Sequence, residues 1–193
     1  MISVCEIGRR AKSVKTGMAQ LSKQDKNNAL RRIAEIIRQN SQLICRANQH
    51  DIQAAKQAGL SEALIDRLLL DEARIEGIAR AVEEIIQLPD PVGQVLSGET
   101  MSEGMQLINV RVPLGVCGII YEARPNVTVD AAALCLKAGN AVILKGGKEA
   151  IESNKALTRL MRQALEEVEL PADCIQLIED TSRQASIELM ELR

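Results

Sequence analysis

Residues 2–88 carry apolar side chains at the spacing of amphipathic α-helices, three or four positions apart. In two such stretches the apolar positions on a single helical face are Ile33, Ile36 and Ile37, and then Ile75, Ile78, Val82 and Ile85. Ser22, Ser61 and Asp71 stand just before periodic stretches, where helix N-caps are found. The pattern predicts that several helices follow one another through residues 1–90.

The pattern changes in residues 91–113, where prolines and glycines interrupt the chain. Residues 94–112 read "QVLSGETMSEGMQLINVRV", two stretches of strand-forming residues on either side of the turn-like "TMSEG". We therefore expect a β-hairpin that separates the helical opening from the rest of the chain.

From residue 114 to residue 193 short apolar runs alternate with helical stretches. Three runs read as strands, at 115–120, 140–145 and 173–179, and three stretches read as helices, at 129–139, 151–168 and 183–192. A βαβαβα order is typical of a parallel sheet with helices on its faces. The prediction is an α/β protein whose second half is a Rossmann-like nucleotide-binding sheet. Because the strands are almost wholly apolar, they are expected to be buried on both sides.

The composition narrows the classes of function. Hydrophobic residues make up 46% of the 193 positions, and with neither Trp nor Phe present the core must be built from aliphatic side chains. The net charge is only -2 with both signs interspersed, which argues against a broad surface for nucleic acid or an anionic membrane. No apolar run reaches the roughly 18 residues of a membrane span, so a cytoplasmic protein is expected.

The cysteines and the histidine give little sign of chemistry. The five cysteines are scattered without a Cys-x-x-Cys pair, so neither a disulfide framework nor a metal site is predicted. Cys117 and Cys135 lie within apolar runs and are expected to be small buried hydrophobic residues. The only histidine, His50, lies in the polar stretch "ANQHD" and is expected at the surface without a functional role.

Polar residues gather where two predicted strands end, which is where open parallel sheets bind ligands. Tyr121, Glu122, Arg124 and Asn126 follow the first strand, and "KGGK", residues 145–148, follows the second. Two lysines, two glycines and the start of a helix that presents free N–H groups suit a phosphate. An ordinary turn with solvated lysines fits the same letters, and Glu122 and Arg124 could simply form an ion pair.

A resemblance adds to this pattern. Residues 111–154, "RVPLGVCGIIYEARPNVTVDAAALCLKAGNAVILKGGKEAIESN", closely resemble the γ-glutamyl phosphate reductases, a family within the aldehyde dehydrogenase superfamily, and the likeness extends over the entire chain. It implies NADPH-dependent reduction of L-glutamate 5-phosphate to L-glutamate 5-semialdehyde and phosphate, the second step of proline biosynthesis. In that family a cysteine thiolate displaces the phosphate, and hydride from the nicotinamide reduces the resulting thioester.

The resemblance also implies roles for the residues that would bind the cofactor. Lys145 matches the strand-end lysine of the superfamily that contacts the adenosine ribose. Lys148 stands where NAD-preferring relatives carry an acidic residue, so it suits the 2′-phosphate of NADP. Gly146 and Gly147 let the backbone approach the cofactor, and Tyr121 takes the place of an aromatic residue beside it.

Glu122, Arg124 and Asn126 lie where contacts with the substrate and with an oxyanion are expected. The oxyanion-binding asparagine of the superfamily directly follows the aromatic residue, whereas here Glu122 takes that place and Asn126 comes four residues later. No oxyanion donor is therefore assigned. Arg124 is the better candidate for an anionic group of the substrate, because a guanidinium pairs in two-pronged fashion with carboxylate or phosphate.

The sequence departs from the family in length. Family members are longer, and their nucleophilic cysteine lies in a part with no counterpart here, so the sequence is expected to be an N-terminal fragment without the catalytic domain. No residue of it is predicted to be catalytic, and alone it is expected to be inactive. The hairpin is of the type that joins subunits, so a homo-oligomer is expected, with glutamate 5-kinase as a further candidate partner. The alternative is a non-catalytic nucleotide-binding or interaction module.

Overall fold

The computed structural model describes residues 2–192, and its first half is helical as predicted. The helices are α1 (Val4–Gln20), α2 (Lys23–Gln39), α3 (Ser41–Gln57), α4 (Glu62–Leu68) and α5 (Glu72–Gln87). Ser22 forms a capping box with Asp25 at the start of α2, and the Asp71 carboxylate accepts a hydrogen bond from the Arg74 N–H at the start of α5. Ser61 also precedes its helix, but its side chain makes no capping hydrogen bond.

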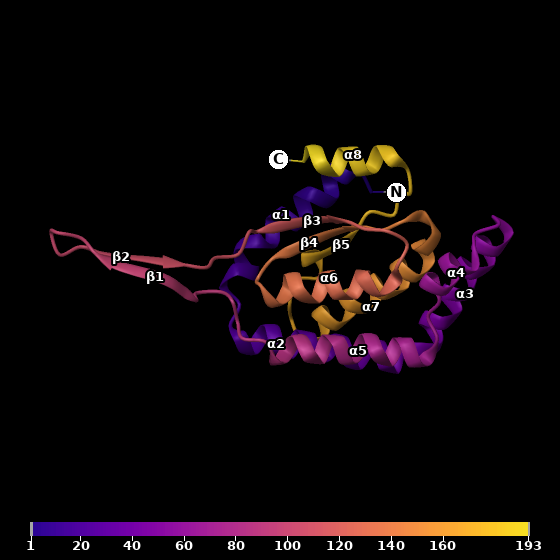
Figure 1. Ribbon diagram of the computed structural model, residues 1–193, viewed down its shortest axis with the longest axis horizontal. Helices are drawn as coiled ribbons and strands as arrows, with labels where there is room; N and C mark the ends of the chain where they lie inside the picture. Colours follow the sequence, from indigo (N-terminus) through magenta and orange to yellow (C-terminus); the bar gives the residue numbers. More distant parts are fainter. Residues whose placement is uncertain (1, 193) are drawn as a thin grey trace.

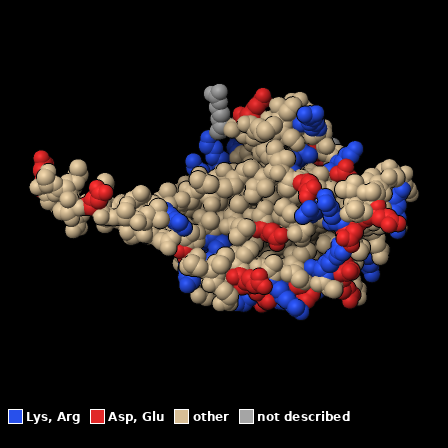
Figure 2. Space-filling view, viewed as in Figure 1, with Lys and Arg blue, Asp and Glu red and all other residues tan. Residues whose placement is uncertain are grey.

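The predicted hairpin is confirmed and projects from the body as an arm (Figure 1). Strand β1 (Val95–Thr100) pairs antiparallel with β2 (Gln106–Val110), and every residue of both strands is exposed. Figure 2 shows that the arm carries few charged side chains, in contrast to the body. At the base of the arm a buried ion pair joins Lys26 Nζ to Asp90 Oδ2 at 2.5 Å. Because Lys26 belongs to α2, this pair attaches the segment between α5 and β1 to α2.

The second half forms the expected parallel sheet. Its strands β3 (Val116–Ile120), β4 (Ala141–Lys145) and β5 (Ile175–Leu177) lie in the order β3-β4-β5. The connecting elements are α6 (Pro125–Lys137), the short 3-10 helix η1 (Lys148–Ala150), α7 (Ile151–Glu167) and a second 3-10 helix η2 (Ala172–Cys174), and α8 (Arg183–Glu191) follows β5.

The sheet lies between two helical layers (Figure 1). Helices α6 and α7 cover one side, with α2 and α5 packed behind them, and α1 and α8 lie on the other side. One continuous apolar core runs through these layers and includes Ile33 of α2, Val129 of α6 and Leu157 of α7. The core consists almost wholly of aliphatic side chains, as the composition predicts.

The expectation that all the strands are buried on both faces is only partly correct. Every residue of β4 is buried, since this strand has a neighbour on each side and helices on both faces. Strand β3 is an edge strand, and its Ile120 keeps 47% of its surface exposed. Cys135 is buried as predicted, but Cys117 of β3 is only half-buried for the same reason. His50 is exposed. None of the helices in residues 2–192 is both long and apolar enough to cross a membrane.

Candidate functional site

The carboxyl ends of the three parallel strands meet at one edge of the body and bring the predicted site residues together. The N–H of Tyr121, just after β3, donates a hydrogen bond to the carbonyl of Lys145 at the end of β4 (3.1 Å). Asp180 follows β5, and hydrogen bonds from Ser182 together with the charge of nearby Lys145 hold the pKa of its carboxyl below the usual value. We call this place, formed by residues 121–126, 145–150 and 180, the strand-end site.

Lys145 is the most unusual residue of the strand-end site. Its side chain is buried, with 5% of the residue exposed, although lysine is rarely buried without a partner. The only hydrogen bond of its Nζ within residues 2–192 is a long one of 3.5 Å to the carbonyl of Gly146, and no carboxylate forms an ion pair with it. An ammonium group has three donors, and leaving a buried charge unpaired is costly. Lys145 is therefore well placed to donate to the oxygens of a ligand.

Gly146 and Gly147 are required by packing inside the protein. A Cβ on Gly146 would lie 2.4 Å from Asn154 Nδ2 and 3.0 Å from the ring of Tyr121. A Cβ on Gly147 would lie 2.9 Å from the backbone N of Ala123. The sequence explained these glycines by the approach of a ligand, but here they let the loops after β3 and β4 come together. Whether the loop also receives a cofactor stays a prediction.

The hydroxyl of Tyr121 points into the protein. It lies 2.7 Å from Thr128 Oγ1, and Thr128 in turn donates to Asn154 Oδ1 at 2.7 Å, so the Tyr121 hydroxyl is the donor in the first bond. Burial raises the pKa of Tyr121 to about 12. Tyr121 can therefore offer the face or edge of its ring to a cofactor, but it is a poor acid or base near neutral pH.

One part of the phosphate hypothesis is wrong. The N-terminus of α7 was expected to present free N–H groups, but a buried carboxylate from α3 already occupies it. Asp51 accepts hydrogen bonds from the N–H of Glu152 (3.1 Å), from the N–H of Ser153 (2.8 Å) and from the Ser153 hydroxyl (2.6 Å). A carboxylate at this position satisfies the helix end and its dipole. These two N–H groups of α7 are therefore not available to an anion at the strand-end site.

A second polar residue of α3 supports the same junction. Asn48 lies one turn before Asp51, and its side-chain amide donates to the carbonyl of Leu68 (2.7 Å) and to Ser153 Oγ (3.1 Å). Its Oδ1 accepts from the N–H of Leu70 at 2.8 Å. Both residues were missed because they lie in a polar stretch around His50. The only signal was their spacing of three positions, which places them on one helical face.

Lys148 is exposed and forms no ion pair within residues 2–192. It lies in η1, directly after the two glycines, so its ammonium group is available at the edge of the strand-end site. This position is compatible with both readings of the sequence, a contact with the cofactor 2′-phosphate and a solvated turn. Its role stays a prediction.

The residues proposed for the substrate lie beside one another. The predicted ion pair is present, with Arg124 Nε 2.6 Å from Glu122 Oε1, and both side chains are partly exposed. Glu122 also lies 3.9 Å from Arg67 of α4. Asn126, in the first turn of α6, donates to Asp130 one turn later at 3.0 Å. The ion pair does not exclude a role in substrate binding, which stays a prediction.

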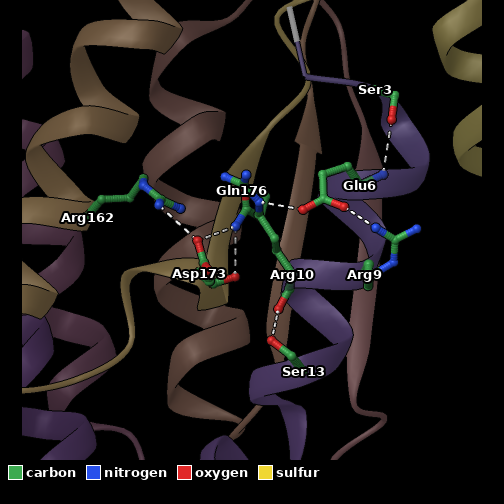
Figure 3. A network of polar contacts seen from close by, with 8 residues as sticks. All are labelled: Ser3, Glu6, Arg9, Arg10, Ser13, Arg162, Asp173 and Gln176. Carbon is green, nitrogen blue, oxygen red and sulfur yellow. Dashed lines mark hydrogen bonds and ion pairs between the residues drawn. The ribbon is translucent and has the colours of Figure 1, made fainter.

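A groove of about 900 Å³ runs along the free edge of β5, between α1 and α7. Figure 3 shows Arg162 of α7 reaching toward this strand, where it donates to the carbonyl oxygens of Ala172 (2.8 Å) and Ile175 (2.7 Å) and to Asp173 (3.0 Å). The N–H of Ile178 donates to the carbonyl of Leu144 in β4. Successive residues of a parallel strand direct their backbone groups to opposite sides, so Ile175, three positions earlier, directs its carbonyl away from β4. The arginine thus covers part of the free edge of β5.

The comparisons with known proteins agree with this fold and with the quoted stretch. The chain is 54% identical over 187 residues to the γ-glutamyl phosphate reductase of Histophilus somni strain 129Pt. The aligned region covers 97% of this chain and 45% of that protein. The corresponding reductase of Carboxydothermus hydrogenoformans is 52% identical over 192 residues, 46% of its length. The chain therefore spans about half the length of the curated relatives it matches, in line with the expected fragment.

Solved structures give the same result. The crystal structure of γ-glutamyl phosphate reductase from Thermotoga maritima matches with a TM-score of 0.96 and 38% identity, over 100% of this chain and 46% of that one. The reductase from Saccharomyces cerevisiae matches with a TM-score of 0.86 and 30% identity, over 94% of this chain and 47% of that one. The model of the aldehyde dehydrogenase family matches residues 3–192. The chain thus belongs to the aldehyde dehydrogenase family.

Proposed function

We propose that the chain is the cofactor-binding part of a reductase that converts L-glutamate 5-phosphate into L-glutamate 5-semialdehyde and phosphate, in proline biosynthesis. The identity of 54% to a γ-glutamyl phosphate reductase supports the reaction. The observation that carries the cofactor role is Lys145, a buried ammonium group at a strand end with donors to spare. The cofactor would be NADPH, whose nicotinamide supplies the hydride when bound.

The residues of the strand-end site fit the adenosine side of such a cofactor. Lys145 would donate to the hydroxyl groups of the ribose from inside the site. Lys148 would meet the 2′-phosphate at the surface, since it is exposed and unpaired within residues 2–192. The Asp51 carboxylate takes the N–H groups of α7, so these two lysines would bear most of the preference for a phosphate.

The cysteines support the expectation that these residues alone do not reduce the substrate. Burial raises the pKa of Cys135 and of Cys174 to about 12, so neither forms a thiolate readily near neutral pH. Cys117 is half-buried near the start of β3, away from the carboxyl end of the strand. The nucleophile of the proposed reaction would come from the remainder of a longer reductase.

The hairpin arm would join two copies of the protein. Among its exposed side chains are Val95, Leu96, Leu107, Ile108 and Val110, each at least 42% exposed. A mostly apolar two-stranded arm with free edges is unstable in water unless it pairs or packs against another chain. A homo-oligomer follows from this surface.

The cofactor assignment is tested by Lys148→Glu in the complete polypeptide. A charge-assisted hydrogen bond is worth about 1.5 to 3 kcal/mol, so the KM for NADPH should rise about tenfold or more. The KM for NADH, which lacks the 2′-phosphate, should change far less. Lys23→Glu is a matched control, because Lys23 is exposed at the start of α2, outside the strand-end site. Equal changes for both cofactors, or no change with NADPH, would return Lys148 to the reading as a solvated turn.

A further inference from the structure

A hollow of about 280 Å³ lies beside the strand-end site, between α4, α5 and the first turns of α6. Its apolar side includes Leu70 and Ile78, and its polar side includes Arg67, Asn126 and Asp130. It begins where the loop after β3 passes into α6, and Asn126, one of the residues proposed for the substrate, lines it. A hollow of this size suits a group no larger than a small amino acid.

Asp130 is a carboxylate in this hollow without a cation. It is half-buried, and its only hydrogen bond within residues 2–192 comes from Asn126 Nδ2 at 3.0 Å. No lysine or arginine of that range forms an ion pair with it, although Arg67 and Arg74 line the same hollow. Burial raises the pKa of Asp130, and the hydrogen bond from Asn126 opposes that rise. A partly desolvated carboxylate of this kind is a favourable partner for an ammonium group.

The two arginines of the hollow differ in what they already bind. The guanidinium of Arg74 forms an ion pair with Asp66 at 2.6 Å and donates to the carbonyl of Leu69 at 3.2 Å. Among the residues that the structure describes, Arg67 has only a long ion pair with Glu122 at 3.9 Å, and about half of its side chain is exposed. Arg67 therefore keeps donors that can pair with a carboxylate in two-pronged fashion.

We propose that this hollow recognises the α-amino and α-carboxylate groups of the γ-glutamyl substrate, an inference that rests on the proposed function. The carboxylate of Asp130 and the Oδ1 of Asn126 receive the α-ammonium group, and Arg67 pairs with the α-carboxylate. The side-chain methylenes lie along Leu70 and Ile78, and the acyl phosphate is directed toward the loop after β3. Asp130 is thus a residue that selects amino acids over simple dicarboxylic acids.

The experiment compares two substrates in the complete polypeptide, with the reaction run in the oxidative direction, so that NADP⁺ accepts the hydride and phosphate is the second substrate. L-glutamate 5-semialdehyde carries the amino group, and 5-oxopentanoate is the same molecule without it. For Asp130→Asn, the KM for L-glutamate 5-semialdehyde should rise about tenfold or more, as expected for loss of a charge-assisted hydrogen bond. The KM for 5-oxopentanoate should stay within about twofold of the parent value, and thermal unfolding should show that the variant is folded.

Two further variants make the test specific. Arg67→Met should raise the KM for both substrates, because both carry the carboxylate. Glu84→Gln changes an exposed residue of α5, one of the helices that form the hollow, and should alter neither KM. The inference is overturned if Asp130→Asn changes both KM values alike or leaves the preference for the amino substrate intact. A parent polypeptide that oxidises neither aldehyde overturns the proposed function and this inference together, so the two failures are distinguishable.

Discussion

The substitution Gly146→Ala tests how tightly the loop after β4 is fixed. The new Cβ would lie 2.4 Å from Asn154 Nδ2, a distance that Cβ atoms essentially never show, and 3.0 Å from two ring carbons of Tyr121, which is also a tight contact. Asn154 is fully buried, and its Oδ1 is held by the Thr128 hydroxyl at 2.7 Å. Neither neighbour can move aside without breaking the network beneath the strand-end site.

The magnitude follows from three contributions. Overpacking a well-packed site costs about 1 to 3 kcal/mol. Displacing Asn154 also loses its hydrogen bond with Thr128, about 0.5 to 1.5 kcal/mol. Alanine reduces the conformational entropy of the unfolded chain, which stabilises the folded state by about 0.4 to 1 kcal/mol. The free energy of unfolding should therefore fall by about 2 kcal/mol, and the Tm by about 4 to 8 °C for a chain of this size.

Thermal and urea unfolding followed by circular dichroism would measure this loss. Gly77→Ala is the matched control, since Gly77 lies within α5 and an added Cβ there meets no atom within 4 Å. That variant should gain about 0.5 to 1 kcal/mol, because alanine is the better helix former. If Gly146→Ala is as stable as the parent, or gains as much as Gly77→Ala, the packing argument for this glycine is refuted.

Four other predictions follow from contacts described above. Asp51→Asn should lower the free energy of unfolding by about 1 to 3 kcal/mol, because one buried N–H of α7 loses its acceptor; unchanged urea unfolding would contradict this. Arg38 and, to a lesser extent, Arg80 lower the pKa of Glu76 from 4.5 to about 2, so these ion pairs stabilise the fold above pH 4.5 and are lost as the pH falls toward 2. Glu76→Gln should accordingly flatten the stability curve between those pH values, and a curve as steep as that of the parent would count against the pair. Ile108→Lys on the arm should shift the sedimentation distribution toward smaller species, because the exposed apolar surface is reduced. An unchanged distribution would show that the arm does not take part in oligomer formation. A polypeptide limited to residues 1–193 should not oxidise NADPH with L-glutamate 5-phosphate above a heat-treated control, and clear turnover would direct attention to Cys117 or Cys135.

Local patterns were enough to predict most of the fold. The helical period of residues 2–88, the turn in "TMSEG" and the alternation after residue 114 each depend on neighbours in sequence, and each is confirmed. The exposure of Ile120 could not be predicted in the same way. Its run of letters resembles that of the fully buried β4, but β3 has a neighbouring strand on one side only, whereas β4 has one on each side.

The sequence located those residues of the site that directly follow a predicted strand. Lys145 and Gly146 follow a strand end directly, so the topological rule for parallel sheets located them. Asp51 escaped notice because its partners lie about 100 residues later, at the start of α7, and nothing near it in sequence indicates burial. Asp130 escaped for a related reason, since its surroundings are formed by α4 and α5, far earlier in the chain.

The position of Tyr121 gives experimenters an optical reporter. It is the only aromatic residue of the chain, and no tryptophan masks its emission. Its ring lies against Gly146, and its hydroxyl is tied to Thr128 at the centre of the strand-end site. In a polypeptide limited to these residues, ultraviolet fluorescence would therefore come from a single known point. Quenching or brightening during a titration would report events at that loop alone, without any label attached to the protein.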